Sequence, residues 1–503
     1  MGIENAEKVA SGIIRQKMNS ETIANGKEFK LKTHGHPLSL KVGRPEKKTD
    51  RVSLEKVSFE TIKELQLNLD LSKRGTQCLV STIKKSAPVE LGVINDLNKA
   101  EQNLKDEYSI SSITCEVNGD ELCQRDIVFV KDIQSFILNI MEQRKLDPKQ
   151  AFVRVGIDGG GGFLKVCVSI FEPDELKNLT ENSGNLGSGV QKLQFLAIVE
   201  DIPETYNNMK TILDHLNLDS LPFYIAWDLK LANMLLGLSS HGAKFGCLFC
   251  EGEKKSESGE LRTFGSLDSH LENFEESGGH IKNAKNFKNV IRKRLIYKDQ
   301  DPRNLILDVV PPPPLHLYMG VVNLLCNLIK DLWPGFEEWA NSKYILRHGY
   351  HGGGYDGSNC RKILKNLESL EAEVRSNAQD AIPVVNSLKC FENVVHDCFS
   401  HELRWSLHTS MNAFKDSIHF LENYLPVCNA ELKVTWKLHI VLCHVEQFCI
   451  KQNSGLAKFA EQTIESVHAK FKSTWGRYKV ASVNRRHGQC LKQAVVDFSF
   501  KRI

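Results

Sequence analysis

Residues 152–171 read FVRVGIDGGGGFLKVCVSIF. An alternating run from Phe152 to Ile157 and a β-rich run from Leu164 to Phe171 flank Asp158 and four glycines, which predicts two strands joined by a loop. The same signals further along the chain predict a third strand, a helix and a fourth strand, at residues 194–202, 203–216 and 221–227. From Asp228 onward nearly every segment has helical periodicity. The pattern therefore predicts an α/β unit followed by a large all-α part.

Three strands, a helix and a fourth strand form the beginning of a ribonuclease H-like fold, although other α/β domains share this order. Asp158 ends the first expected strand, and Asp228 ends the fourth. If these strands are neighbours, the two carboxylates converge, and a cation between them would relieve their repulsion. On a helix expected over residues 456–475, either Glu461 or Glu465 could supply a third ligand. Three carboxylates around two Mg²⁺ ions would make a phosphoryl-transfer site.

The glycine run 159–162 has an alternative interpretation as a phosphate-binding loop of a sugar-kinase or actin-like ATPase. No Gly-Lys-Ser/Thr follows the run, so it is not a Walker A motif. A second glycine-rich phosphate loop on a later strand is also missing from the sequence. These two departures disfavour the ATPase.

The overall charge is nearly balanced, with 65 Lys and Arg against 62 Asp and Glu in 503 residues. Basic side chains nevertheless concentrate in residues 280–299 and 466–503, the latter including Arg485 and Arg486. Basic segments of this kind suit a polyanion such as DNA, because each phosphate contact releases counterions. The alternative is a solvated helix face. The length suggests about three domains, and the composition is that of a globular protein.

A second indication of DNA binding lies near the N-terminus. Gly43-Arg44-Pro45 matches the core of an AT-hook-like element, in which the arginine lies along a narrow minor groove. A helix through Phe59 and a break then precede Ser72, a plausible N-cap for a helix that begins with Lys73 and Arg74. This order predicts a helix-turn-helix, with an ordinary helical hairpin as the alternative.

The 14 cysteines do not indicate secretion, because no apolar leader and no membrane-spanning apolar run of about 20 residues are present. Cys247 and Cys250 are separated by two residues, and His439 and His444 by four. Together they could close a structural zinc site between distant segments. An isolated CxxC and histidines on a helix surface are the alternative.

These motifs, in this order, resemble the Transib transposases and their relative, the catalytic subunit of the V(D)J recombinase. The resemblance covers about residues 43–500 and rests on spacing, with Asp228 nineteen residues before Cys247 and a Glu-Ser pair about twenty residues after the two histidines. The matching motifs are Gly43-Arg44-Pro45, Asp158-Gly159, Asp228, Cys247-x2-Cys250, Leu315-His316 with Gly320, Asn359 with Arg361-Lys362, His439-x4-His444-Val445 and Glu465-Ser466.

The resemblance implies a DDE enzyme in which Asp158, Asp228 and Glu465 hold two Mg²⁺ or Mn²⁺ ions and the Cys2His2 set holds one structural Zn²⁺. It implies nicking of each transposon end, attack of the freed 3′-OH to leave a hairpin on flanking DNA, and insertion of the excised ends. It also implies a homodimer in the nucleus, acting on double-stranded terminal repeats and target DNA. The residues expected to contact DNA are Arg44, Lys73, Arg74, Arg361, Lys362, Arg485 and Arg486.

The expected organisation has six segments. They are a flexible leader (1–40), a helical DNA-end-binding domain (41–86), a linker with dimerisation or DNA-binding helices including one at 126–143 (87–150), a ribonuclease H-like core (151–246), a zinc-pinned helical insertion (247–455), and a final catalytic helix with a basic tail (456–503). The long regulatory N-terminal region of the recombinase has no counterpart, which indicates a stand-alone transposase. A domesticated, non-catalytic, zinc-containing DNA-binding protein is the alternative. Trp436 is either a base-stacking residue or part of the core.

Overall fold

The computed structural model describes residues 28–33, 36–41, 57–69, 71–85, 92–117, 119, 121–172, 193–218, 222–240, 242–347 and 353–502. Gly43-Arg44-Pro45 lies outside these residues. Part of the expected leader is described as two antiparallel strands, β1 (Glu28–Thr33) and β2 (His36–Lys41).

A six-stranded mixed sheet forms the centre of the protein, in the order β3-β4-β7-β6-β5-β8. Neighbouring strands are antiparallel except β5 and β8, which run parallel. The four predicted strands are present, and the first and the fourth are neighbours. The strands are β3 (Tyr108–Glu116), β4 (Leu122–Val130), β5 (Phe152–Asp158), β6 (Phe163–Phe171), β7 (Leu193–Glu200) and β8 (Tyr224–Ala226).

The sheet is larger than the sequence analysis expected. Residues 108–130, taken as a linker and the start of a helix, form β3 and β4 instead, and the helix α5 (Ile133–Gln143) begins only after Asp132 caps it. The apolar run Ile127–Val130 is too short to establish a period by itself. Its ladder with β7, which pairs Ile127 with Val199, depends on a strand about 70 residues away.

Two C-terminal helices cover the sheet. α20 (Gln462–Trp475) packs on β5, and α21 (His487–Phe500) packs on β3, β4 and β7. Phe195 of β7 has edge contact with Phe471 of α20 and a tilted contact with Phe498 of α21. The single helix expected over residues 456–475 is divided, because a short 3₁₀ turn, η7 (Leu456–Phe459), precedes α20.

The N-terminal helices α2 (Phe59–Asn68) and α3 (Lys73–Ile83) confirm the expected helix, break and helix. The Ser72 side chain accepts a hydrogen bond from the Gly75 amide, so its predicted capping role is confirmed. α4 (Val93–Glu107) and α8 (Tyr206–Asp214) complete this half of the molecule, with α4 against α21.

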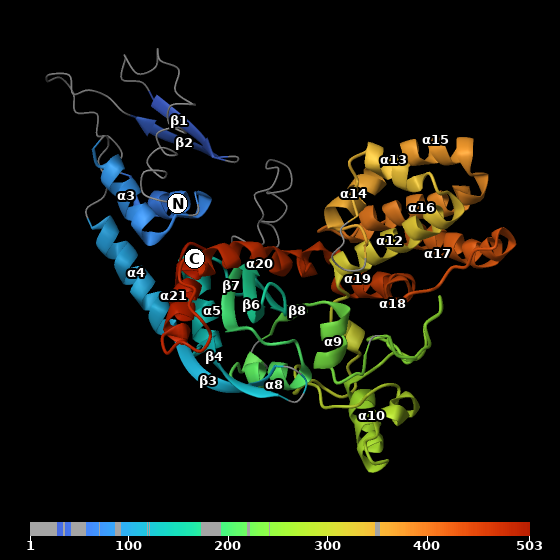
Figure 1. The fold of residues 1–503 in the computed structure, drawn as a ribbon, viewed down its shortest axis with the longest axis horizontal. Helices are drawn as coiled ribbons and strands as arrows, with labels where there is room; N and C mark the ends of the chain where they lie inside the picture. The colour runs from blue at the N-terminus through green and yellow to red at the C-terminus, as the bar shows by residue number, and fades with distance from the viewer. Residues whose placement is uncertain are drawn as a thin grey trace.

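The rest of the chain is helical and gathers beside the β8 edge of the sheet, opposite α3 and α4 (Figure 1). Its α-helices are α9 (Leu229–Leu235), α10 (Phe264–Glu276), α11 (Ile306–Val309), α12 (Pro314–Leu332), α13 (Phe336–Ser342), α14 (Gly357–Lys365), α15 (Leu367–Asn377), α16 (Ile382–Cys398), α17 (Leu407–Tyr424), α18 (Trp436–Ile440) and α19 (Glu446–Gln452). The shorter elements are η3 (Ile281–Phe287), η4 (Gln379–Ala381), η5 (Leu425–Cys428) and the π-helix η6 (Val441–Val445).

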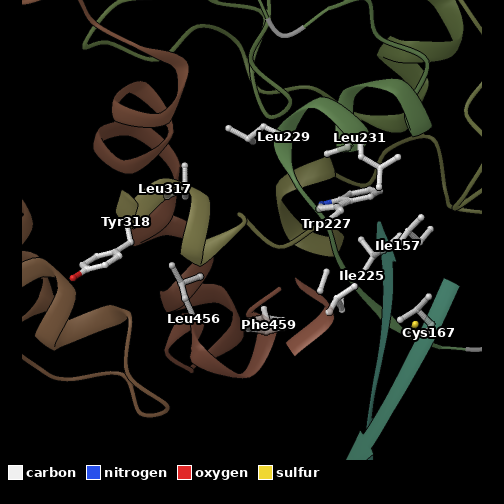
Figure 2. Close-up of a cluster of buried hydrophobic side chains, with 14 of the residues drawn as sticks. Ile157, Cys167, Ile225, Trp227, Leu229, Leu231, Leu317, Tyr318, Leu456 and Phe459 are labelled. Carbon is white, nitrogen blue, oxygen red and sulfur yellow. The ribbon is translucent and has the colours of Figure 1, made fainter. Parts of the chain in front are cut away.

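The sheet and the helical part share one apolar core. Figure 2 shows Ile157 of β5 and Ile225 of β8 in a cluster with Phe459 of η7 and Leu317 of α12. Each of these four side chains is buried. Within the described residues, no helix combines the length and the apolar character needed to cross a lipid bilayer.

Candidate functional site

Two aspartates lie at the same end of adjacent parallel strands. The ladder pairs Val155 with Ile225 and Gly156 with Ala226, and Asp158 and Asp228 each follow this last pair by two residues. The Asp228 side chain also caps α9, where it accepts a hydrogen bond from the Leu231 amide at 2.6 Å. The topology therefore brings these two predicted carboxylates to the C-terminal ends of β5 and β8, which we call the acidic edge of the sheet.

α20 brings further acidic groups to this edge. Glu465 is 42% exposed, and its Oε1 lies 3.6 Å from Nε2 of His316. Partial burial raises the pKa of Glu465. The nearby Glu461 and Asp158 raise this pKa further, whereas His316 lowers it. Glu461 is buried instead, and its Oε1 accepts hydrogen bonds at 2.9 Å from the amide and Nδ1 of His316.

Glu204 belongs to the same group of acids and was not foreseen from the sequence. It lies between β7 and α8, and Lys230 donates to its Oε1 at 3.1 Å. Burial raises the pKa of Glu204, and Asp228 and Asp158 act in the same direction. A Cβ at Gly159 would lie 2.8 Å from Oε2 of Glu204, so this glycine allows the close approach. The signal available in the sequence was the position of Glu204 directly before Thr205, the N-cap of α8.

Asp158 has two nitrogen partners. Lys165, which is directly opposite it in the β5–β6 ladder, approaches Oδ2 at 3.3 Å, and Nε2 of His468 contacts the same oxygen. Burial by itself would raise the pKa of Asp158, but the His468 hydrogen bond and the Lys165 charge outweigh burial and lower it to about 2. Asp158 is therefore an anion at neutral pH.

The glycine run after Asp158 accommodates a side chain. A Cβ at Gly160 would lie 2.3 Å from Cε1 of His468, and Gly161 has a φ of +69° that other residues adopt only with strain. The imidazole of His468 thus fills the concave side of the loop. This packing gives the glycines a role that needs no bound nucleotide.

The three carboxylates expected to share metals are not the group whose ligand atoms converge most clearly. Among the described residues, one group of three or more Cys, His, Asp or Glu could hold a metal ion, and its ligand atoms all lie within 4.8 Å of one another. That group consists of Cys247, Cys250, His439 and His444, all four of which are buried.

The Cys2His2 group has the geometry of a metal centre. Sγ of Cys247 lies 3.4 Å from Nε2 of His444, and Sγ of Cys250 lies 3.3 Å from Nε2 of His439. Nδ1 of His439 donates to the Lys255 carbonyl at 2.6 Å, which leaves Nε2 as the ligand atom. The group could therefore bind a metal ion.

A π-helix explains why two histidines five positions apart face the same centre. In an α-helix, residues five apart point about 140° away from each other. His439 lies in the α-helix α18, and His444 lies in the π-helix η6, which follows α18 directly. The wider turn of the π-helix brings the two rings to a centroid distance of 5.2 Å.

Arg262 supports this centre and was not singled out in the sequence. It is fully buried, and its Nε donates to the backbone carbonyls of both Cys247 and Cys250 at 3.1 Å. Its guanidinium also donates to the Lys288 carbonyl at 2.8 Å. Arg262 thereby holds the CxxC turn by its main chain, a role that no sequence motif marks.

The basic residues expected to contact DNA are at several places. Arg361 donates to Gln462 of α20 at 3.2 Å, close to Glu465, whereas Lys362 donates to the Tyr344 carbonyl. Lys73 pairs with Glu101 at 2.8 Å. Arg74, Arg485 and Arg486 are exposed. The seventh residue, Arg44, lies outside the described residues.

Trp436 belongs to the core. Its side chain is 5% exposed, and its ring has an edge contact with His439 at 5.3 Å. The base-stacking interpretation of Trp436 is therefore wrong, because the ring packs beside the Cys2His2 group and has no free face for a base.

The model of a domain of unknown function (DUF8703) matches residues 121–263 of the chain. This segment runs from β4 to the residue before α10 and contains Asp158, Asp228 and the CxxC pair. A search among curated proteins found no match for the chain.

Proposed function

We propose that this chain is a Transib-like DDE transposase, which nicks transposon ends, forms hairpins on the flanking DNA and joins the excised ends to a target. The observation that carries the proposal is the position of Asp158 and Asp228 at the same end of the parallel pair β5 and β8. Glu465 of α20 lies near enough to Asp158 for the two charges to interact.

The strand order supports a ribonuclease H-like core. β5, β6 and β7 are successive antiparallel neighbours, and β8 lies parallel to β5 on its other side, which gives the order 3-2-1-4 for the four strands predicted from the sequence. In this arrangement the ends of the first and fourth strands form the natural meeting point of acidic ligands. β3 and β4 would be an addition at the β7 edge.

The residues fit a pair of divalent cations. Asp158, Asp228 and Glu465 offer only oxygen ligands, as Mg²⁺ and Mn²⁺ prefer. Burial raises the pKa values of Glu465 and Glu204, and neighbouring carboxylates, Asp158 among them, add to the rise. Bound ions would supply Lewis acidity for displacement at phosphorus. Asp228 would offer its second oxygen, because Oδ1 holds the first turn of α9.

The Cys2His2 group fits a structural Zn²⁺. The four ligand atoms converge, and the amide of Phe249 donates to Sγ of Cys247 at 3.4 Å, which suits a thiolate. Bound zinc would connect the CxxC turn to α18 and η6, which lie almost 200 residues later.

The proposed substrate is double-stranded DNA, and the proposed assembly is a homodimer that pairs two ends in the nucleus. The exposed Arg485 and Arg486, which precede α21, and Arg361, which is beside α20, would contact the backbone. Lys73 and Arg74 at the start of α3 would contact the DNA if α3 acts as a recognition helix.

The test of this function is a nicking assay with Asp228→Asn. Asparagine caps helices as well as aspartate does, so the variant keeps the α9 cap while it loses the negative charge. Purified protein, Mg²⁺ or Mn²⁺ and DNA that carries candidate element ends are incubated, and nicked and hairpin products are resolved on a denaturing gel. We expect Asp228→Asn to reduce nicking at least about 10³-fold, while end binding stays within about twofold.

Asp416→Asn, an exposed change on α17, is the matched control and should nick as the parent does. Metal-dependent nicking that survives Asp228→Asn would refute the proposed site. Parallel loss of binding and nicking would mean that the substitution unfolds the domain, and end binding without nicking by the parent protein would favour a non-catalytic DNA-binding protein.

A further inference from the structure

The hydrogen bonds and ion pairs of the Asp158 carboxylate all involve one of its two oxygens, Oδ2. Nζ of Lys165 and Nε2 of His468 both approach Oδ2. Among the described residues, no hydrogen bond or ion pair reaches Oδ1. The Asp158 side chain is 28% exposed, so the carboxylate is accessible from solvent.

Lys165 also determines which nitrogen of His468 carries a proton. Its ammonium lies 2.7 Å from Nδ1 of His468 and 3.2 Å from the carbonyl of Gly160. An ammonium only donates hydrogen bonds, so Nδ1 accepts, and in a neutral ring the proton is on Nε2. His468 therefore donates to Oδ2 of Asp158. The chain of contacts runs from Lys165 through the imidazole to the carboxylate.

The surroundings leave this arrangement little freedom. Lys165 is 1% exposed and is directly opposite Asp158 in the ladder. The ring of His468 is held against Gly160 and Gly161, where any Cβ would collide with it or crowd it.

We propose that Lys165 and His468 are positioning residues, which occupy Oδ2 of Asp158 so that this carboxylate binds a divalent metal through Oδ1 alone. The inference rests on the proposed function, because it assumes that Asp158 is a metal ligand. Hydrogen bonds to ligand carboxylates are a common way in which a protein fixes the orientation of its metal ligands.

The same contacts argue against His468 as a ligand itself. Coordination through Nε2 would require the proton on Nδ1, where it would face the Lys165 ammonium. Removing His468 should therefore weaken metal binding without changing the preference between metals. An imidazole ligand would instead favour Mn²⁺ over Mg²⁺, since nitrogen ligands suit the transition metals.

The test is Mn²⁺ and Mg²⁺ binding to the full chain by isothermal titration calorimetry, with Mn²⁺ binding repeated by electron paramagnetic resonance. We expect His468→Ala to raise the Kd for Mn²⁺ about 10-fold, within the range for second-sphere substitutions, and to leave the ratio of Mn²⁺ to Mg²⁺ affinity unchanged. His468→Gln, whose amide can still donate to Oδ2, should restore the Kd to within about threefold of the parent. Lys165→Met should weaken binding as His468→Ala does, provided that its thermal melting shows a folded protein.

Two reference variants make each outcome interpretable. His419→Ala, an exposed change on α17, should bind as the parent does. Asp158→Asn should abolish binding at this site. If Asp158→Asn binds metal like the parent, the proposed function fails at its metal site, and this inference fails with it. If Asp158→Asn loses binding but folded His468→Ala keeps parental affinity, only the positioning role is overturned. A fall in the Mn²⁺ to Mg²⁺ ratio would overturn it in favour of a nitrogen ligand.

Discussion

At the scale of single residues, a glycine decides how closely α20 approaches the sheet. A Cβ on Gly156 would lie 1.8 Å from Cδ1 of Ile464, so any side chain here pushes α20 away from β5. Ile464 precedes Glu465, and a displaced helix would carry Glu465 away from Asp158. The acidic edge therefore depends on a residue that has no functional group.

The first residue-scale prediction is that Gly156→Ala destabilises the protein by about 1–3 kcal/mol through overpacking. Ile464→Ala removes Cγ1 and Cδ1 and leaves Cβ at 3.5 Å, an ordinary contact. In the Ile464→Ala background, Gly156→Ala should therefore cost much less. Thermal melting of the two single variants and the double variant measures this coupling. Additive effects in the double variant would show that Ile464 does not limit the approach.

A buried histidine makes the fold sensitive to pH. Nδ1 of His487 lies 3.0 Å from Oδ2 of Asp126, and Nε2 lies 2.9 Å from Oε2 of Glu200. The hydrogen bond with Glu200 raises the pKa of His487 above 6.5, burial opposes this rise, and Asp126 adds to it. Because both nitrogens face carboxylate oxygens, the doubly protonated ring suits the site. The two carboxylates, one on β4 and one on β7, therefore favour a protonated ring at the start of α21.

The second residue-scale prediction follows from this raised pKa. The protonated ring contributes stability that is fully present below the unfolded pKa of about 6.5 and is lost as pH rises through the higher folded value. The melting temperature of the parent should therefore exceed that of His487→Gln most at pH 5.5–6.5, and the difference should shrink towards pH 9. A difference that stays constant over this range would show that His487 is not protonated in the folded protein.

At the scale of elements, the Cys2His2 group joins a turn in the middle of the chain to a helix near its end. The CxxC turn is held by Arg262, and the histidines are presented by α18 and η6. The helical part follows the sheet in sequence, and the chain returns to the sheet through η7 and α20. The Cys2His2 group therefore helps to position the segment that leads to Glu465.

The element-scale prediction concerns metal content. The parent should contain one equivalent of zinc per chain by elemental analysis, and Cys247→Ser should lose it. Because metal binding is coupled to folding, we expect the melting temperature of Cys247→Ser to fall by about 5 °C or more. Cys78→Ser is a matched control, because this cysteine is exposed on α3 and outside the ligand group, and it should retain the zinc. A folded parent without zinc would reject the structural site.

At the scale of the whole molecule, the exposed basic residues and the acidic edge come from distant parts of the chain. Arg485 precedes α21, while Arg74 begins α3, which is at the same side of the sheet as α4 (Figure 1). Two basic residues of the C-terminal run, Lys501 and Arg502, do not contribute to this surface, because they are buried, whereas Lys470, Lys472 and Lys479 are exposed. Local charge density in the sequence therefore overstates the basic surface only at the last residues of the run.

The whole-molecule prediction separates two kinds of DNA contact. Arg485→Ala should weaken binding to cognate and scrambled duplexes about equally and lower the salt slope by about one phosphate contact. Arg44→Ala should weaken binding to A/T-rich cognate ends more than to scrambled DNA, because a minor-groove arginine reads groove width. Fluorescence anisotropy over a salt titration measures both, with the exposed Lys433→Ala as control. Equal binding by Arg44→Ala and the parent would reject the minor-groove role.

Local patterns were sufficient for several elements. The alternation around Asp158 predicted β5 and β6, Ser72 predicted the start of α3, and the CxxC and His-x4-His spacing predicted the four residues that converge in the structure. Each of these predictions relies on interactions within a few residues or on ligand chemistry that limits the usable residue types.

Other features depended on contacts between segments far apart in sequence. β4 was misassigned because its ladder with β7 lies outside any local window, and the burial of Trp436 depends on its packing beside the Cys2His2 group. The contacts that Glu204, Lys165, His468 and Arg262 make have the same origin, since each bonds with a strand, turn or helix that only folding brings near. Residue type and spacing therefore determined which groups were available in this chain, whereas tertiary packing decided which atoms of those groups face one another.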